Sequence, residues 1–322
     1  MTKLRRRGLL TLAGILLASA PGAPAARAGE VWITNMQSAN VQVFDPGTLD
    51  PLATIPAGRG AHNVTLGPDG TKAFVANVDA STVTIIDTER KVALATIPAG
   101  PKAHDVAVSP DGRVAVAADV GGDTVAVIDV ERREALGVLT TGPKAMMARF
   151  SADGTMLYVG NAGPGTVSVV DVAGWSVLGT LPGGVGMMRF VPVDGGMRVW
   201  FPAPGEGGGV LKLLDLATGA IAGVVPMPGD PHGMALSPDG RTLYVAQREP
   251  RRLVAVDLAT RAERMAVTLD GKPDMLAISP DGATLYATLR DADRLVMLST
   301  ADLAVVRQAP TGVEPHGIAF RP

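Results

Sequence analysis

Short apolar runs separated by turn-forming residues follow one another along almost the whole chain. The stretch 103–142 holds one full unit: an apolar run, a Pro-Asp-Gly turn, a second run, a polar loop, a third run ending in Ile-Asp, and a fourth run before a glycine-rich link. The runs are rich in Val, Ile and Ala and are bounded by turn residues, which predicts β-strands. No window shows sustained helical periodicity.

The turn between the first and second runs recurs at a nearly constant interval, with spacings of 42, 42, 40, 46, 42 and 42 residues. A period in this range is typical of solenoids, propellers and arrays. Four strands in each of seven units predict an all-β fold, a seven-bladed β-propeller with four antiparallel strands per blade. The residues that occupy this turn column are Pro68, Pro110, Ala152, Pro192, Pro238, Pro280 and Pro322.

The array starts one strand late and ends one strand early. The runs at 31–35, 40–45 and 51–55 match the second, third and fourth strands of the repeat, whereas the final run at 315–320 matches the first. We therefore predict a ring closed by the N-terminal three strands plus the C-terminal strand. Such closure hides edges that a sheet would otherwise expose.

The N-terminus has the pattern of an export signal. Basic residues precede an apolar stretch from Leu9 to Ala20, and Ala26-Arg27-Ala28 offers a cleavage site. We predict a signal peptide over residues 1–28, a single propeller domain over 29–322, and a periplasmic or secreted protein. Arg6-Arg7 fits a twin-arginine signal, and a general secretory signal is the alternative. No run is long enough to span a bilayer.

Composition and charge exclude several classes of function. The chain has no cysteine, which excludes disulfides, thiolate metal ligands and covalently attached c-type haem. Without the five basic residues of 1–28, 24 Lys and Arg face 31 Asp and Glu, a net charge of −7. This balance counts against nucleic-acid binding. We expect a monomer.

Several strands carry a family pattern. Trp-Ile-Thr-Asn (32–35), Phe-Val-Ala-Asn (74–77), Tyr-Val-Gly-Asn (158–161) and the Ser-Pro-Asp-Gly turns resemble the signature of the YVTN-repeat β-propellers. The resemblance covers residues 31–322. It implies an exported bacterial or archaeal propeller, in a family of diverse functions that includes relatives associated with redox systems. Fold does not supply function.

Every histidine in the chain lies six residues before the turn column, at the start of an innermost strand. Ring closure would bring these positions to one height around the channel mouth. Imidazole suits copper, zinc, iron or nickel, and thioether sulfur favours Cu(I). The candidate metal ring is His62, His104, His232, His316, Met146 and Asp274, with Met187 at the seventh position.

Two interpretations of this column stay open. One ancestral histidine could have been copied by duplication, each copy binding a backbone carbonyl between blades. Alternatively, the column binds a transition metal, copper first and zinc second. The favoured function is then an exported, non-catalytic binding or scaffold protein that supports a periplasmic redox or metal-handling system.

Other functions remain as alternatives. A lactonase or lyase in the channel would use histidine as a general base, although we find no hydrolase elbow, phosphate-binding loop or His-Glu-x-x-His motif. An envelope protein without a small-molecule site is the third possibility. Mixed charges on the loops between second and third strands predict a periplasmic protein partner on that face. Two interpretations of the glycine-rich loop 205–210 stay open: a tolerated loop variation, or a flexible flap at the mouth of the ring.

Overall fold

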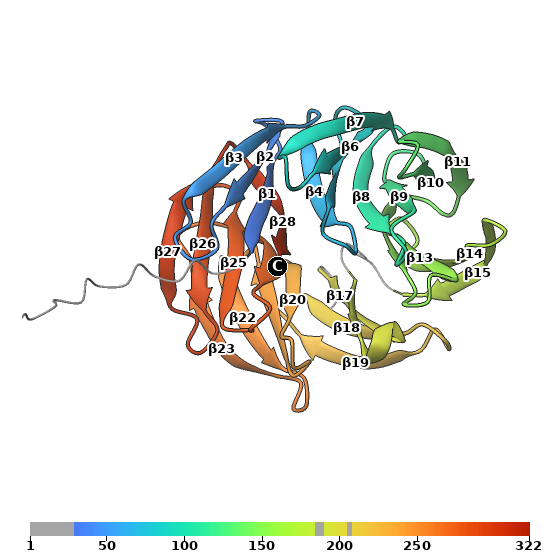
Figure 1. Ribbon diagram of the computed structural model, residues 1–322. Helices are drawn as coiled ribbons and strands as arrows, with labels where there is room; N and C mark the ends of the chain where they lie inside the picture. Colours follow the sequence, from blue (N-terminus) through green and yellow to red (C-terminus); the bar gives the residue numbers. More distant parts are fainter. Residues whose placement is uncertain (1–28, 184–189, 205–207) are drawn as a thin grey trace, which may run out of the picture.

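The computed structural model describes residues 29–183, 190–204 and 208–322. These residues form seven four-stranded antiparallel sheets arranged as blades around a central channel (Figure 1). The predicted seven-bladed β-propeller is therefore confirmed. The signal peptide predicted over 1–28 and part of the glycine-rich loop lie outside the described residues, so both stay predictions.

Each blade runs from an innermost to an outermost strand, and we name the blades A to G in chain order. Blade A contains β28 (Pro315–Arg321), β1 (Glu30–Asn35), β2 (Asn40–Phe44) and β3 (Pro51–Pro56). Blade B contains β4 (Ala61–Leu66), β5 (Lys72–Asn77), β6 (Thr82–Asp87) and β7 (Val92–Pro98). Blade C contains β8 (Ala103–Val108), β9 (Val114–Asp119), β10 (Thr124–Asp129) and β11 (Glu134–Thr140). Blade D contains β12 (Ala145–Phe150), β13 (Met156–Asn161), β14 (Thr166–Asp171) and β15 (Ser176–Pro182).

The last three blades follow the same order. Blade E contains β16 (Val191–Val193), β17 (Arg198–Ala203), β18 (Val210–Asp215) and β19 (Ile221–Pro226). Blade F contains β20 (Pro231–Leu236), β21 (Thr242–Gln247), β22 (Arg252–Asp257) and β23 (Ala262–Thr268). Blade G contains β24 (Pro273–Ile278), β25 (Thr284–Leu289), β26 (Arg294–Ser299) and β27 (Val305–Pro310).

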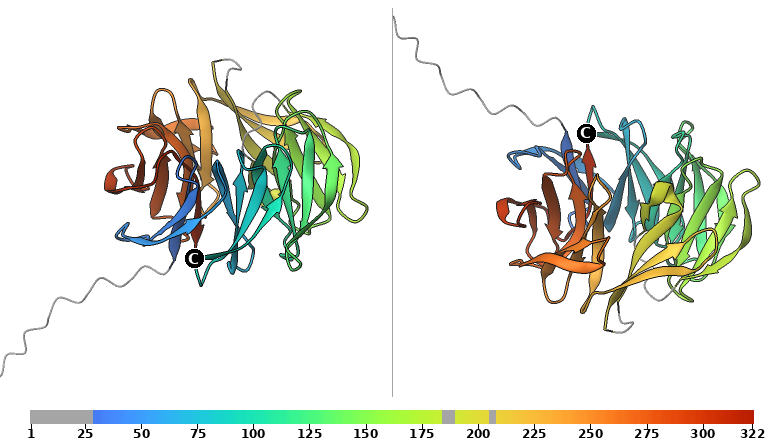
Figure 2. Two further views of the ribbon diagram at one scale, coloured as in Figure 1. Left: turned by 90° about the horizontal axis from the view of Figure 1, so that it is seen from above. Right: turned by 90° about the horizontal axis from the view of Figure 1, so that it is seen from below.

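Blade A closes the ring as the sequence predicts. The C-terminal β28 pairs antiparallel with β1, with Val31 opposite Phe320 and Ile33 opposite Ile318. The C-terminus thus lies beside the channel at one face of the ring (Figures 1 and 2). Because both ends of the chain share one sheet, β1 has a hydrogen-bonded neighbour on each side.

The core consists of apolar layers between neighbouring blades. Trp32, Val41 and Val43 of blade A pack with Val75 and Ile86 of blade B, and equivalent clusters fill other seams. Strands buried on both faces read as continuous apolar runs, which is why the second and third strands lack polar alternation. Outermost strands are exposed instead: most of β11 and β15 faces solvent.

Blade E departs from the repeat. Its innermost strand β16 has three residues, and the turn after it is the 3₁₀ helix η1 (Asp194–Gly196), the sole helical element in the described residues. In regular blades Gly112 and its equivalents take positive φ in the Pro-Asp-Gly turn. No helix within the described ranges is long and apolar enough to cross a membrane.

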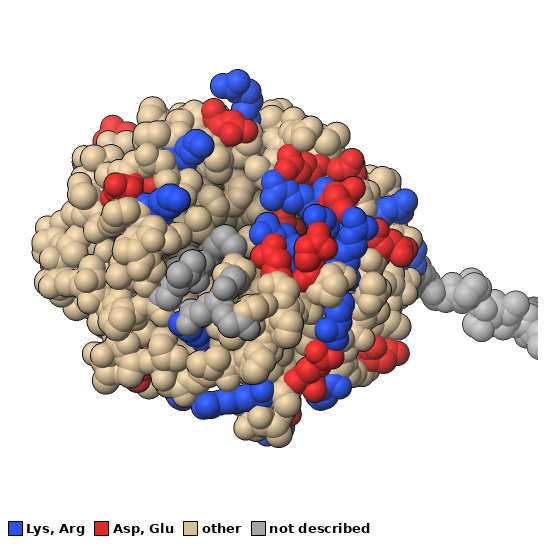
Figure 3. Space-filling model, turned by 180° about the vertical axis from the view of Figure 1, so that it is seen from behind, with Lys and Arg blue, Asp and Glu red and all other residues tan. Residues whose placement is uncertain are grey.

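The ring has two distinct faces. We call the upper face the one where the innermost strands begin, which also carries the loops between second and third strands. The lower face carries the Pro-Asp-Gly turns and the C-terminus. Figure 1 views the lower face, and Figure 3 views the upper face from behind.

Candidate metal centre at the upper end of the channel

The candidate residues share one position in the fold. Each is the second residue of an innermost strand, so all begin at the upper face. Met187, at the seventh position, lies outside the described residues. The six described residues and their strands are His62 (β4), His104 (β8), Met146 (β12), His232 (β20), Asp274 (β24) and His316 (β28).

Three histidines on consecutive blades form a relay of hydrogen bonds across the seams. Nδ1 of His316 donates to the carbonyl oxygen of His62 at 3.0 Å, and Nδ1 of His62 donates to that of His104 at 3.1 Å. Nδ1 of His104 donates in turn to the carbonyl of Met146 at 2.9 Å. A carbonyl oxygen only accepts, so each neutral ring carries its proton on Nδ1 and a lone pair on Nε2.

The rings of this relay are in close, tilted contact. The ring centroids of His62 and His316 lie 3.7 Å apart, and those of His62 and His104 lie 4.1 Å apart. Burial lowers the pKa of His62 well below its usual range, and repulsion from His316 and His104 lowers it further. Burial, then Arg290, lowers the pKa of His316 similarly. These imidazoles are therefore neutral at pH 7, the form in which histidine binds metals.

Asp274 meets two of the histidines on the next blades. Nε2 of His232 lies 3.2 Å from its Oδ1, and Nε2 of His316 lies 3.6 Å from its Oδ2. The side chain is fully buried, and neither carboxylate oxygen has a hydrogen bond to a described residue. Burial raises the pKa of Asp274 to about 6, opposed by the charges of Arg248 and Arg290.

Two arginines form ion pairs with this carboxylate at distances longer than a hydrogen bond. An Nη1 atom of Arg248 lies 3.7 Å from Oδ1 of Asp274, and that of Arg290 lies 3.6 Å from Oδ2. Each arginine has its own acidic partner: Arg248 pairs with Asp230 at 2.7 Å, and Arg290 pairs with Glu314. The cluster thus has three carboxylates against two guanidinium groups and is net negative.

The structure brings together part of the candidate ring. His232, Asp274 and His316 each offer one ligand atom, and these atoms lie within 4.8 Å of one another. They form the one such group of three or more in the described chain. The His62 ring lies in tilted contact with that of His316, and the His104 ring contacts His62 in the same way. Met146 accepts a hydrogen bond from His104 through its backbone carbonyl.

Arg248 and Arg290 belong to the mixed-charge loops between second and third strands, and sequence reasoning missed their contact with Asp274. A signal was present, because each arginine directly follows the second strand of its unit, in the two consecutive blades F and G. These side chains, with Asp230 and Glu314, also line a cavity of about 750 Å³ in the upper face. Figure 3 shows charged side chains of both signs gathered there, beside the channel mouth.

No protein-family model matches the chain, and neither does any curated protein. Solved structures do match. The chain has a propeller fold shared with hydrazine synthase of Kuenenia stuttgartiensis, at TM-score 0.73 and 18% identity over 80% of this chain and 88% of that one.

Two further structures agree. Dihydro-heme d1 dehydrogenase NirN, in complex with DHE, matches at TM-score 0.69 and 17% identity, over 94% of this chain and 78% of that one. A functionally unknown protein from Desulfotomaculum acetoxidans matches at TM-score 0.76 and 14% identity, over 91% of this chain and 99% of that one. Identities this low show the fold alone, and the resemblance to the YVTN-repeat family stays a prediction.

Proposed function

We propose that this protein binds a divalent transition metal ion at the upper end of its channel. The ligands are Nε2 of His232, Nε2 of His316 and the carboxylate of Asp274. The protein would act as an exported, non-catalytic binding protein that handles metal or supports a redox enzyme. A protein partner would dock on the charged upper face beside the site.

One observation carries this proposal: two hydrogen-bond acceptors face each other in a buried place. The bond from Nδ1 of His316 to the carbonyl of His62 leaves the lone pair on Nε2, which lies 3.6 Å from an oxygen of Asp274. An ionised carboxylate has no proton to donate. A cation between the two atoms removes this repulsion, and buried charges are paired or coordinate metals.

The spacing suits a metal ion. Zinc bonds to histidine nitrogen and carboxylate oxygen are about 2.0–2.2 Å long, so two ligands of a tetrahedral site lie about 3.4 Å apart. The distances of 3.2 Å and 3.6 Å from Asp274 to the two histidines fall on either side of that value. The negative charge that attracts a cation comes from the Asp274 carboxylate itself, because Asp230 and Glu314 offset the charges of Arg248 and Arg290.

The donor set of two nitrogens and one oxygen suits Cu(II) and Zn(II). Along the series of divalent first-row transition metals, affinity for such a site is highest for copper and lower for zinc, so copper should bind more tightly. The thioether of Met146 has no part in this set. The fold match to NirN, a dehydrogenase in complex with DHE, is compatible with a redox role for this protein. The match is one of fold and identifies no shared site residue.

Titration calorimetry of the chelator-treated, full mature protein with CuCl₂ and ZnCl₂ tests the proposal. We expect near-stoichiometric binding, weakened at least about 100-fold by Asp274→Asn, because even outer-shell substitutions cost about 10–100-fold. His104→Gln is the matched control: it alters the same column outside the ligand set and should keep the affinity. Absence of binding to the unaltered protein would overturn the proposal.

A second candidate is acid–base chemistry at the same residues. The pKa of Asp274, about 6, would allow this carboxyl group to share a proton with a neighbouring histidine near neutral pH. A channel lactonase or lyase would then hydrolyse or cleave members of a lactone panel in the presence of chelator. Its activity would be lost in Asp274→Asn while metal binding was absent.

A further inference from the structure

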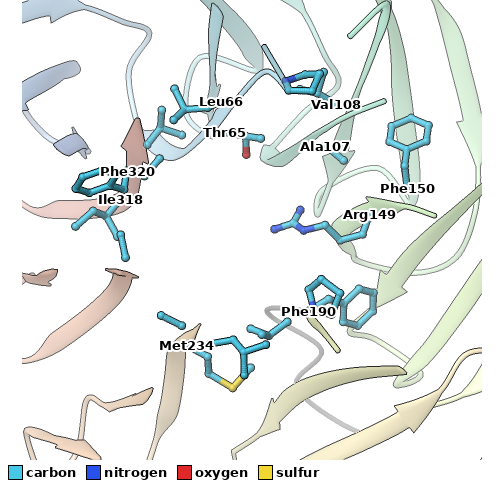
Figure 4. Close-up of a pocket in the computed structure, with 18 of the residues that line it drawn as sticks. Thr65, Leu66, Ala107, Val108, Arg149, Phe150, Phe190, Met234, Ile318 and Phe320 are labelled. Atoms are coloured by element: carbon cyan, nitrogen blue, oxygen red, sulfur yellow. The ribbon is translucent and has the colours of Figure 1, made fainter. Parts of the chain in front are cut away.

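A second cavity lies at the other end of the channel. It has a volume of about 730 Å³ and opens on the lower face, lined by the ends of innermost strands from all seven blades. Its described lining is almost wholly apolar, with Phe150, Phe190, Met234 and Phe320 among the larger side chains (Figure 4). Arg149 is the one charged side chain in that described lining.

Arg149 is held in place by a buried partner. Its Nη1 donates to Oδ2 of Asp105 at 2.9 Å and to the carbonyl of Ala148 at 2.6 Å. Oδ1 of Asp105 in turn accepts from Nδ2 of Asn63 at 3.4 Å. Both arginine bonds use Nη1, so within the described residues the Nε and Nη2 protons remain for a ligand. Figure 4 shows the guanidinium directed toward the middle of the cavity.

The two charges of this pair differ in access. The Arg149 side chain is 29% exposed, whereas that of Asp105 is 6% exposed. A molecule in the cavity therefore meets the donors of the cation and not the oxygens of the anion. An accessible guanidinium in an apolar wall recognises a carboxylate, because charge-assisted bonds to it are strong and directional.

We propose that the lower cavity is a binding site for a hydrophobic monoanion, a molecule with an apolar body and one carboxylate. The apolar wall contributes through burial of the body, and Arg149 fixes the charged end, the usual division of labour in small-molecule sites. A polyanion is disfavoured, because Arg149, the one cation of the described lining, is already paired with Asp105 and cannot balance several buried charges. A cationic ligand is disfavoured too, because its charge would lie against the like charge of the Arg149 guanidinium.

This site is independent of the proposed metal centre. Asp274 is the second residue of strand β24, near the upper face, whereas Leu276, Ala277 and Ile278 of the same strand line the lower cavity. A substitution at Asp274 should therefore leave ligand binding below unchanged.

Calorimetric titration with 2-naphthoate and its neutral isostere 2-naphthamide tests the inference on the folded mature chain. Because Asp105 already compensates Arg149, we expect naphthoate to bind about tenfold more tightly than the amide. Arg149→Met should abolish that preference by weakening naphthoate alone. Asp274→Asn, the control at the other end of the channel, should preserve it.

Arg149→Met leaves the Asp105 carboxylate buried without its partner, so this variant could fail to fold. The double variant Asp105→Asn/Arg149→Met removes both charges and keeps the test decisive. Loss of the anion preference in the double variant supports the site. The inference is overturned if the unaltered protein binds neither probe, binds both equally, or if the double variant still prefers naphthoate.

Discussion

Nδ1 of His104 lies 2.9 Å from the carbonyl oxygen of Met146, and this hydrogen bond joins blade C to blade D. His62 and His316 make the same bond across the two preceding seams. The bond from one ring nitrogen to a carbonyl is the structural role expected of a duplicated histidine. It also fixes the tautomer that leaves a lone pair on the other ring nitrogen, so in His316 one nitrogen can join the blades while the other binds the proposed metal ion.

Removing the His104 ring should therefore weaken the seam between blades C and D. His104→Ala leaves the carbonyl of Met146 without its donor, and we expect a loss of about 2 kcal/mol in the free energy of unfolding. His104→Gln retains an N–H donor and should lose less. Urea denaturation at pH 8 with chelator measures both, and equal stability of His104→Ala and the unaltered protein would contradict the seam role.

The same histidine should make stability depend on pH. Burial lowers the pKa of His104 in the folded state, so the unfolded state binds more protons as the pH falls below about 6.5. The stabilising contribution is complete above that pH and is lost toward the lowered folded-state pKa. In that window His104→Gln should flatten the dependence of unfolding free energy on pH by up to about 1.4 kcal/mol per pH unit.

Asp274 changes the pH dependence of stability in the opposite direction, so His104→Gln must be compared with the unaltered protein. Its pKa is raised from 3.8 to about 6 on folding, so its contribution is present below about pH 4 and is lost as the pH rises through 6. Because Asp274 is common to both proteins, the difference between their pH profiles isolates His104. Superimposable profiles between pH 5 and 7 would show that its pKa is not lowered.

The sequence predicted those features that repeat. The turn column, the four-strand unit and the match of 315–320 to a first strand were enough to predict seven blades and their closure through β28. The register of His62 and His316 followed from the same alignment of units. Repetition makes such positions equivalent, and ring closure then places them at one height.

Features that occur in a single blade or seam were beyond this reasoning. The contact of Arg290 with Asp274 depends on which way two long side chains turn, and the repeat does not encode that direction. The pair of Asp105 and Arg149 joins two blades at a lower position of the innermost strands, and no other unit has an aspartate at the position of Asp105. Side-chain direction and partner choice are set by packing across the seam.

Gly233, which follows His232, should be intolerant of a side chain. A Cβ at this position would lie 2.2 Å from the carbonyl oxygen of Asp274 and 2.7 Å from Cα of Met275. Gly233→Ala should therefore separate blades F and G at the proposed metal centre, and we expect a loss of about 2–3 kcal/mol together with weaker copper binding.

Gly137 provides the matched control for that substitution. It lies on the outermost strand β11, and a Cβ there would have no atom within 4 Å. Gly137→Ala should leave stability within about 0.5 kcal/mol of the unaltered protein. Thermal unfolding of the two variants side by side compares them, and similar melting temperatures would mean that the F–G seam is not closely packed.

The Asp105–Arg149 pair should respond unequally to the loss of either partner. Arg149→Met leaves a carboxylate that is 6% exposed without its cation, and we expect a cost of about 3 kcal/mol, because unpaired buried charges are strongly destabilising. Asp105→Asn leaves a guanidinium that is 29% exposed and still bonded to the carbonyl of Ala148, so its cost should be smaller. The double variant Asp105→Asn/Arg149→Met should be more stable than Arg149→Met alone, because it removes the unpaired buried charge.

Urea denaturation of the unaltered protein, the two single variants and the double variant measures these differences in a double-mutant cycle. A larger cost for Asp105→Asn than for Arg149→Met would reverse the assignment of the hidden and accessible charges, and with it the reason for expecting an anion in the lower cavity.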